Sequence, residues 1–128
     1  MITVNRQTEY ALFLINHLKG EDTPVSLEKI CRHSGLSGRF MAKVASGLKK
    51  AKMLGSREGA GGGYWLLVDT KKTSLWKIFE IFENNKRIVS CLDGNDCMRR
   101  CRLKGFWKKM ESDFIKQIKK VTLSEIIG

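Results

Sequence analysis

The sequence predicts a mainly α-helical fold with one small β-hairpin. Apolar residues recur three and four positions apart in several segments, which is the period of an amphipathic helix. A glycine-rich stretch, residues 59–63, lies between two short apolar segments, which is typical of a hairpin. A single proline and a 42% share of apolar residues favour a folded chain over a disordered one.

A first helix is predicted over residues 5–19. Its apolar residues, with Tyr10, Leu14 and Leu18 among them, follow the helical period, and Gly20 ends the pattern. Polar residues come first and no uninterrupted apolar segment follows, so this region is not predicted to be a signal peptide. No apolar run approaches the roughly 20 residues that span a bilayer. We therefore expect a cytoplasmic protein with no membrane contact.

Two shorter helices follow and predict a helix-turn-helix. Ser26 is placed to cap a helix over residues 27–33, and Ser37 to cap another over 38–52. The tetrapeptide SGLS between them favours a tight turn, and two short helices joined by such a glycine-containing turn form this motif. The second helix is rich in basic side chains, which agrees with a DNA-binding role.

A wing is predicted directly after the helix-turn-helix. The apolar segments 53–54 and 64–68 flank the glycine-rich tip and are expected to pair as strands. Glycine lacks side-chain bulk, so the tip can approach a DNA backbone closely. Together these elements define a winged helix-turn-helix domain.

Two further helices are predicted in the second half of the chain. Thr73 and Ser74 open a helix over residues 75–85, and a long helix is expected over 101–120. Because the preceding domain is already closed, the apolar stripe of the long helix needs another partner. A second copy of the chain is the simplest choice and gives a twofold dimer.

The chain is therefore expected to have three parts. They are a winged helix-turn-helix domain (1–84), a cysteine loop (85–102), and a dimerisation helix with a C-terminal turn (103–128). The dimerisation stripe consists of Trp107, Met110, Phe114, Ile118 and Val121.

The charge indicates a polyanionic partner. The net charge is +11, from 24 Lys and Arg against 13 Asp and Glu, and double-stranded DNA is the expected partner. Base contacts are expected from Arg39, Phe40 and Lys43, and phosphate contacts from Lys43, Lys49 and Arg57. With two histidines and no nucleophile–base constellation, the chain is not expected to be an enzyme. The full predicted DNA-binding set is Ser37, Arg39, Phe40, Lys43, Lys49, Ser56, Arg57, Gly59, Gly62, Gly63 and Tyr64.

Three of the four cysteines lie in the stretch SCLDGNDCMRRCRLKGFW, residues 90–107. Clustered cysteines in a cytoplasmic protein more often bind metal or sense redox state than form structural disulfides. A metal cluster, a thiol switch, a zinc site and free thiols without a function are the alternatives, and nearby arginines favour reactive thiolates. Zinc fits less well, because closed zinc sites usually need a shorter first spacing and four ligands. Cys31, in a short helix, is expected to be a small buried hydrophobe.

These motifs together resemble a known family. The strings EYAL, VSLEKICRHSGLS, LKKAKMLGSREGAGGGYWL, TSLWKIFEIFE, FWKKM and VTLSEI are similar to winged-helix transcription regulators of the Rrf-two type, which include IscR, NsrR and CymR. The resemblance covers nearly the whole chain. It implies a homodimer on a roughly palindromic operator, with recognition helices in major grooves and wings in minor grooves. By family habit it implies repression.

The resemblance also implies a cofactor. In several members three loop cysteines hold an iron–sulfur cluster, 2Fe-2S or 4Fe-4S, and the matching residues are Cys91, Cys97 and Cys101. Glu9 of the partner subunit or His33 is the implied fourth ligand. A cluster-free thiol/disulfide switch and a CymR-like regulator controlled by a partner protein remain alternatives.

The chain departs from the family pattern at three places. The spacing Cys-x₅-Cys-x₃-Cys is shorter between the second and third cysteine, and Lys104 stands where some members have a histidine ligand. In the wing, Glu58 separates Arg57 from the first glycine, so the arginine lies one residue earlier than in relatives. A cationic lysine cannot replace the histidine ligand, which is why Glu9 and His33 are considered.

Overall fold

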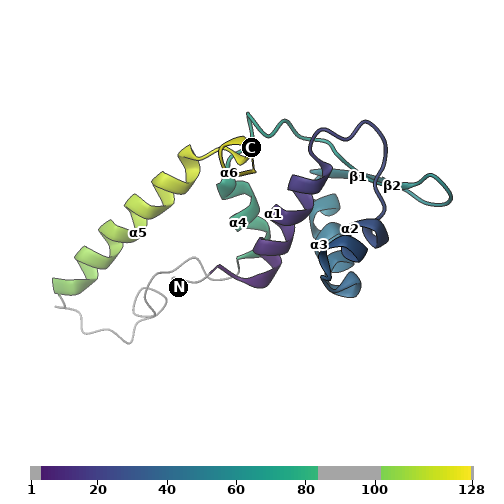
Figure 1. Ribbon diagram of the computed structural model, residues 1–128. Coiled ribbons are helices and arrows are strands. Elements are labelled where there is room, and N and C mark those ends of the chain that lie inside the picture. Colours follow the sequence, from purple (N-terminus) through teal and green to yellow (C-terminus); the bar gives the residue numbers. More distant parts are fainter. Residues whose placement is uncertain (1–3, 84–101, 128) are drawn as a thin grey trace.

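The predicted helices and hairpin are present in the computed structural model, which describes residues 4–83 and 102–127 (Figure 1). The predicted cysteine loop lies outside the described residues except for Arg102, so the division into three parts stays a prediction. In chain order the elements are α1 (Arg6–Leu18), α2 (Leu27–Ser34), α3 (Gly38–Lys50), β1 (Leu54–Arg57), β2 (Gly63–Leu66), α4 (Leu75–Phe82), α5 (Arg102–Lys120) and α6 (Leu123–Ile127).

Serine caps start three of the helices, as predicted. The Ser26 side chain accepts a hydrogen bond from the backbone N–H of Lys29 at 3.2 Å, which fixes the start of α2. Ser37 accepts from the N–H of Phe40 at 3.3 Å at the start of α3. Ser74 does the same at α4, with the N–H of Trp76 at 3.1 Å. Each cap satisfies one of the N–H groups that a helix start leaves unpaired.

Helix α3 ends two residues earlier than expected. Lys52 has a φ of +63°, in the left-handed region, and the chain then turns so that the N–H of Met53 donates to the carbonyl of Leu48 at 3.0 Å. This closes the helix at Lys50. Helix α4 also ends early, at Phe82, with Glu83 as its C-cap.

The hairpin extends further toward its glycine tip than the apolar pattern predicts. The strands pair antiparallel from Leu54 opposite Leu66 to Arg57 opposite Gly63. Val25 adds a single bridge to Tyr64, with N–H···O distances of 2.9 and 2.8 Å. The polar residues of the strands therefore pair through their backbones, which an apolar period does not reveal.

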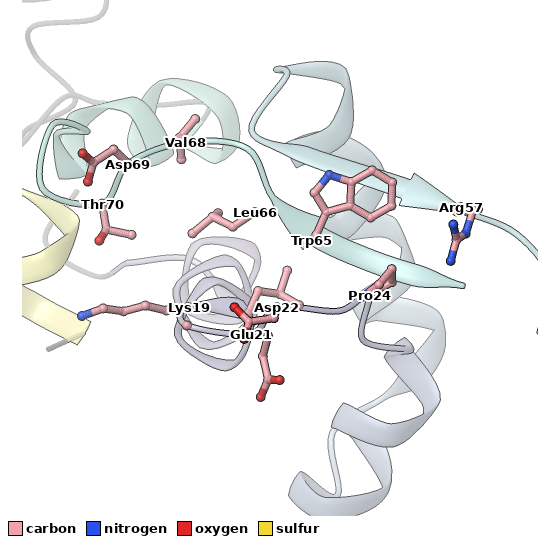
Figure 2. Close-up of a pocket in the computed structure, with 12 residues that line it drawn as sticks. Lys19, Glu21, Asp22, Pro24, Arg57, Trp65, Leu66, Val68, Asp69 and Thr70 are labelled. Carbon is pink, nitrogen blue, oxygen red and sulfur yellow. The ribbon is translucent and has the colours of Figure 1, made fainter. Parts of the chain in front are cut away.

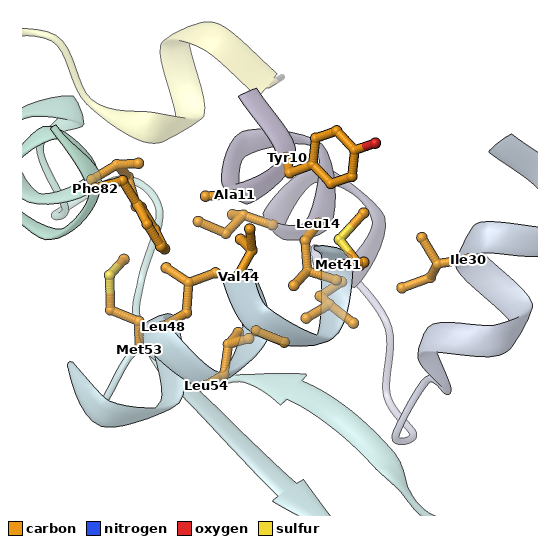
Figure 3. Packing of buried hydrophobic residues seen from close by; sticks show 14 of the residues in the cluster. Tyr10, Ala11, Leu14, Ile30, Met41, Val44, Leu48, Met53, Leu54 and Phe82 are labelled. Atoms are coloured by element: carbon orange, nitrogen blue, oxygen red, sulfur yellow. The ribbon is translucent and has the colours of Figure 1, made fainter. Parts of the chain in front are cut away.

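The core lies between α1, α3, α4 and the first strand (Figure 3). Helix α1 packs against both α3 and α4, and α3 leads directly into the hairpin. The largest fully buried side chains are Leu14, Ile15, Met41, Leu48, Met53, Leu54, Ile78 and Leu123. This packing fixes α3 rigidly and leaves its other face in solvent.

The C-terminal segment returns to this core, a feature that the sequence interpretation did not include. Leu123 of α6 is fully buried, and its N–H donates to the carbonyl of Thr73 at 2.9 Å. Ser74 and Thr122 form a further backbone bridge. Helix α5 itself runs away from the body of the molecule toward its N-terminal end (Figure 1).

Most of the apolar residues of α5 are exposed. Only Ile118, near the end of the helix, is buried. Leu103, Phe106, Met110 and Phe114 are 60%, 53%, 44% and 51% exposed. Among the described helices, none combines the length and apolar character needed to cross a membrane.

A buried polar network joins the start of α1 to the end of α4. Asn5 caps α1 by accepting from the N–H of Thr8 at 2.9 Å, and its side-chain amide donates to the carbonyl of Phe82 at 2.7 Å. One oxygen of Glu83, Oε1, accepts from the N–H of Asn5 at 2.9 Å and from the Thr8 hydroxyl at 3.0 Å. The network therefore holds α1 against the last described residue before the cysteine segment.

Candidate nucleic-acid interface

Helices α2 and α3 form the predicted helix-turn-helix. Gly35 ends α2 with a φ of +73°, and its N–H donates to the carbonyl of Cys31 at 2.9 Å. The chain turns there and Ser37 starts α3 two residues later. The tight turn is thus set by local residues, in agreement with the SGLS motif.

Helix α3 separates apolar and basic residues onto opposite faces. Met41, Val44, Ala45 and Leu48 are buried against the core. Arg39 and Lys43 are exposed, and Ser46 and Lys50 follow on the same face at intervals of three and four residues. Lys49 is exposed at the edge of this face. We call Arg39, Lys43, Ser46 and Lys50 the basic face of α3.

None of the basic side chains of α3 has an ion-pair partner among the described residues. Their charge is therefore available to an external polyanion. Lys50 and Ser46 were not among the predicted DNA-binding residues. The spacing of 39, 43, 46 and 50 is the signal that would have found them.

Phe40, a predicted base contact, packs inward for much of its surface. Its ring meets the ring of Tyr10 edge to face, with centroids 4.6 Å apart and planes at 84°. The half-buried ring therefore links α3 to α1. This contact explains an aromatic residue near the start of α3 independently of DNA.

The wing presents an exposed arginine at its tip. Arg57 ends β1, and its guanidinium donates to the carbonyl of Gly61 at 3.3 Å. Ser56 is half-buried opposite Tyr64, while Glu58 and Gly59 are exposed in the loop. Arg57 thus closes the glycine loop and remains accessible from outside.

Two predicted wing glycines also have structural reasons. A Cβ on Gly63, whose φ is +145°, would lie 2.5 Å from the backbone carbonyl of Val25. A Cβ on Gly62 would overlap the carbonyl oxygen of Arg57. Both positions need glycine because other backbone passes close by. Tyr64 is held by its two hydrogen bonds to Val25.

A pocket of about 600 Å³ lies beside the base of the wing (Figure 2). Arg57 and Trp65 border it, and Lys19 lies on the opposite side. Three carboxylates, from Glu21, Asp22 and Asp69, also line it. Because these would repel phosphate, the pocket itself is poorly suited to DNA. The exposed tip and the basic face of α3 suit DNA better.

The predicted cluster ligands are largely outside the described residues. Cys91, Cys97 and Cys101 all lie outside them. Glu9 is described and is exposed in the first turn of α1, where an oxygen donor can reach another molecule. His33 lies within α2. Within residues 4–83 and 102–127, no three His, Cys, Asp or Glu residues gather as a metal site.

Cys31, the one described cysteine, is half-buried and packs on the core. Its contact with the core agrees with the hydrophobic role predicted for it, but the side chain is not fully buried as predicted. Its position on α2 separates it in the sequence from the other three cysteines.

Comparison with known proteins gives a family match along almost the whole chain. The model of the Rrf2 family, described as "Iron-dependent Transcriptional regulator", matches residues 4–128. The regulator IscR of Vibrio cholerae is 27% identical over 112 residues, which are 86% of this chain and 65% of that protein. The chain therefore spans just under two thirds of the length of this relative.

Solved structures show the same fold. CymR, described as the global cysteine regulator of B. subtilis, gives a TM-score of 0.79 at 20% identity, covering 99% of this chain and 97% of CymR. The IscR of T. potens gives 0.74 at 24% identity, covering 98% of this chain and 86% of that one. The shared fold extends over the helix-turn-helix, the wing and the C-terminal helix.

Proposed function

The chain belongs to the Rrf2 family of transcriptional regulators, and we propose that it acts as a homodimer on a roughly palindromic DNA operator. Its relatives are transcriptional regulators and not enzymes. The observation that carries the proposal is the basic face of α3, whose charged side chains have no ion-pair partner among the described residues. The helix starts at the Ser37 cap, and its buried apolar side keeps the basic face exposed.

The proposed contacts divide into two kinds. Arg39 and Lys43 lie in the first half of the exposed face and would read base edges in the major groove. Lys49, Lys50 and the wing residue Arg57 would contact phosphates. Phe40, which is half-buried, would contribute through its exposed part while holding α3 on Tyr10.

The wing residues would follow the backbone next to the recognition helix. Gly59 at the exposed tip permits close approach, and Ser37 and Ser56 offer hydroxyl groups near the two elements. Gly63 and Tyr64 would act by fixing the wing on Val25, and Gly62 by allowing the close approach to Arg57 within the tip.

DNA binding is tested by a salt titration. An operator is first selected from random duplexes, and the affinity is then measured by fluorescence anisotropy at several salt concentrations. With roughly seven phosphate contacts, we expect affinity to fall about a thousandfold or more between about 50 and 200 mM salt. An affinity independent of salt would contradict a DNA interface built on these basic residues.

We further propose that Cys91, Cys97 and Cys101 hold an iron–sulfur cluster whose presence alters operator affinity. Three thiolates are the usual donor type for such clusters, and the family description names iron dependence. The exposed carboxylate of Glu9, from the partner subunit, or His33 would complete the ligands. When bound, such a cluster supplies a redox- and ligand-sensitive centre.

This proposal predicts a coloured protein after anaerobic purification, with matching iron and sulfide counts per chain. Glu9→Ala and His33→Ala would then identify the fourth ligand by loss of iron. A colourless protein that stays iron-free after reconstitution would contradict the cluster. Thiol chemistry at the same three cysteines, or control by a partner protein, would then remain for the sensing role.

A further inference from the structure

A second pocket, of about 420 Å³, lies where the end of α5 meets the start of α4. Four parts of the chain line it: the connection from α3 to β1, the segment after the wing, and the helices α4 and α5. It contains none of the predicted DNA or cluster residues. Its volume is in the range that small-molecule sites occupy.

The floor of the pocket is apolar. Met53, at its base, is almost fully buried, and Val68 and the indole of Trp76 are half-buried beside it. A flat apolar group could therefore leave water by packing on this floor.

The rim is basic. Lys72, Lys77 and Lys119 line the pocket and are exposed, while Glu80 is the one carboxylate among its lining residues. Lys119 holds its Nζ 5.4 Å from the centroid of the Trp76 ring. Neither Lys72 nor Lys77 has a carboxylate partner within the described parts of the chain. The three ammonium groups thus favour an anion above the apolar floor.

We propose that this pocket binds a small aromatic carboxylate. The ring would lie on Val68 and Trp76, and the carboxylate would face the lysines at the rim. Exposed lysines each add little to binding alone, so the combination of ring and charge defines the ligand class.

The position of the pocket gives the ligand a way to act on the regulator. Lys119 belongs to α5, whereas Trp76 and Lys77 belong to α4, which packs on α1 in the core of the DNA-binding part. Helix α5 leaves the body from this junction (Figure 1). Because the helix rises about 1.5 Å per residue, a small change of its angle here displaces its far end by a larger distance. An effect on operator affinity rests on the proposed function, whereas ligand binding does not.

The site is tested with 2-naphthoate on the full chain, by isothermal titration calorimetry without DNA. We expect one site per chain, and at least tenfold weaker binding for the neutral 2-naphthamide. Lys77→Glu should weaken naphthoate binding tenfold or more. Lys109→Glu, an exposed charge reversal on α5 outside the pocket and next to Met110, should change it less than twofold.

Three results would overturn the proposal. The first is no binding at millimolar naphthoate, and the second is equal affinity for the neutral amide. The third is a loss of naphthoate affinity in Lys109→Glu as large as in Lys77→Glu or larger, which would place the binding site on the exposed apolar side of α5. Circular dichroism of both variants verifies that they are folded. Because the titration contains no DNA, its result can be interpreted even if the proposed DNA-binding function is wrong.

Discussion

Gly63 illustrates how one backbone position holds the wing against the helix-turn-helix. The residue pairs with Arg57 across the hairpin, and its neighbour Tyr64 bonds to Val25 just before α2. With a φ of +145° and a hypothetical Cβ only 2.5 Å from the Val25 carbonyl, the position excludes a side chain. The wing is therefore held directly against the start of the helix-turn-helix.

Gly63→Ala should lower the free energy of unfolding by about 1–3 kcal/mol, because the backbone must shift and the residue is strained. Gly105→Ala is the matched control. Gly105 lies in α5 with no atom within 4 Å of a new Cβ, so alanine should stabilise the helix by about 0.5–1 kcal/mol. Urea unfolding at equal protein concentration measures both. Equal midpoints for Gly63→Ala and the wild type would refute the close-approach argument.

Glu83 is the second residue whose role is set by burial. Its Oε1 accepts two hydrogen bonds at the start of α1, while its Oε2 is buried without a partner among the described residues. A carboxylate there interacts favourably with the helix N-terminus. The residue is also the last one described before the cysteine segment, and its hydrogen bonds hold the end of α4 on the start of α1.

Two substitutions of Glu83 distinguish the contribution of its hydrogen-bond acceptor from that of its negative charge. Glu83→Ala leaves the Asn5 N–H unpaired, whereas the Thr8 hydroxyl can still donate to Asn5 Oδ1, and the change should cost about 1–3 kcal/mol of unfolding free energy. Glu83→Gln keeps an acceptor and buries no charge, so we expect a loss of about 1 kcal/mol or less. Thermal and urea unfolding compare the two. A glutamine variant as unstable as the alanine variant would show that the charge, and not the acceptor, holds the cap.

At the scale of elements, α3 joins the core to the proposed DNA surface. Its apolar side is fixed by α1 and α4, and Tyr10 and Phe40 connect α1 and α3. The positions of Arg39 and Lys43 are thus determined by buried contacts on the other side of the same helix. Such a rigid support is needed for side chains that distinguish bases.

Arg39→Ala should relax sequence preference, because a bidentate base contact is worth about 1–3 kcal/mol of discrimination. Lys49→Ala should weaken binding equally on operator and random DNA. The slope of log affinity against log salt concentration should decrease by about the value of one phosphate contact. Anisotropy titrations on both duplexes measure the difference. If Arg39→Ala lost equal affinity on operator and random DNA, its base-reading role would be excluded.

The elements differ in how far the sequence could predict them. The serine caps and the apolar side of α1 were predicted correctly, because capping and helical period are local properties. The strand ends were not, since Ser56 and Arg57 pair through backbone groups across the hairpin. The link from Asn5 to Glu83 spans 78 positions and leaves no local pattern.

The candidate DNA site was predictable to a similar extent. The basic residues of α3 follow from its period, and Lys50 could have been included by the same rule. The packing of Phe40 on Tyr10, in addition to its proposed DNA contact, could not be predicted from the period, because this packing depends on how two helices cross. The inward return of α6 through Leu123 likewise depends on contacts with residues some 50 positions earlier.

At the scale of the whole molecule, α5 is the helix with the largest exposed apolar side in the described part of the chain. Four large apolar side chains along it, Leu103, Phe106, Met110 and Phe114, are each more than 40% exposed. A contiguous exposed apolar surface of this kind usually marks an interface. Near its C-terminal end the helix is held by the buried Ile118 and by the bridge between Ser74 and Thr122. This geometry supports the proposed dimer, in which two copies of α5 cover each other.

Phe114→Glu should convert the proposed dimer into a monomer, because it places a charge within the apolar surface, where burial without a partner is costly. Ser112→Glu adds the same charge at an exposed polar position of α5 and should leave the dimer intact. Sedimentation equilibrium measures both.

Since a monomer engages one half-site at a time, operator affinity should fall about a hundredfold or more for Phe114→Glu alone. If Phe114→Glu sediments like the wild type, the exposed side of α5 is not the dimer interface; if it is monomeric yet binds the operator unchanged, the two-half-site argument is wrong.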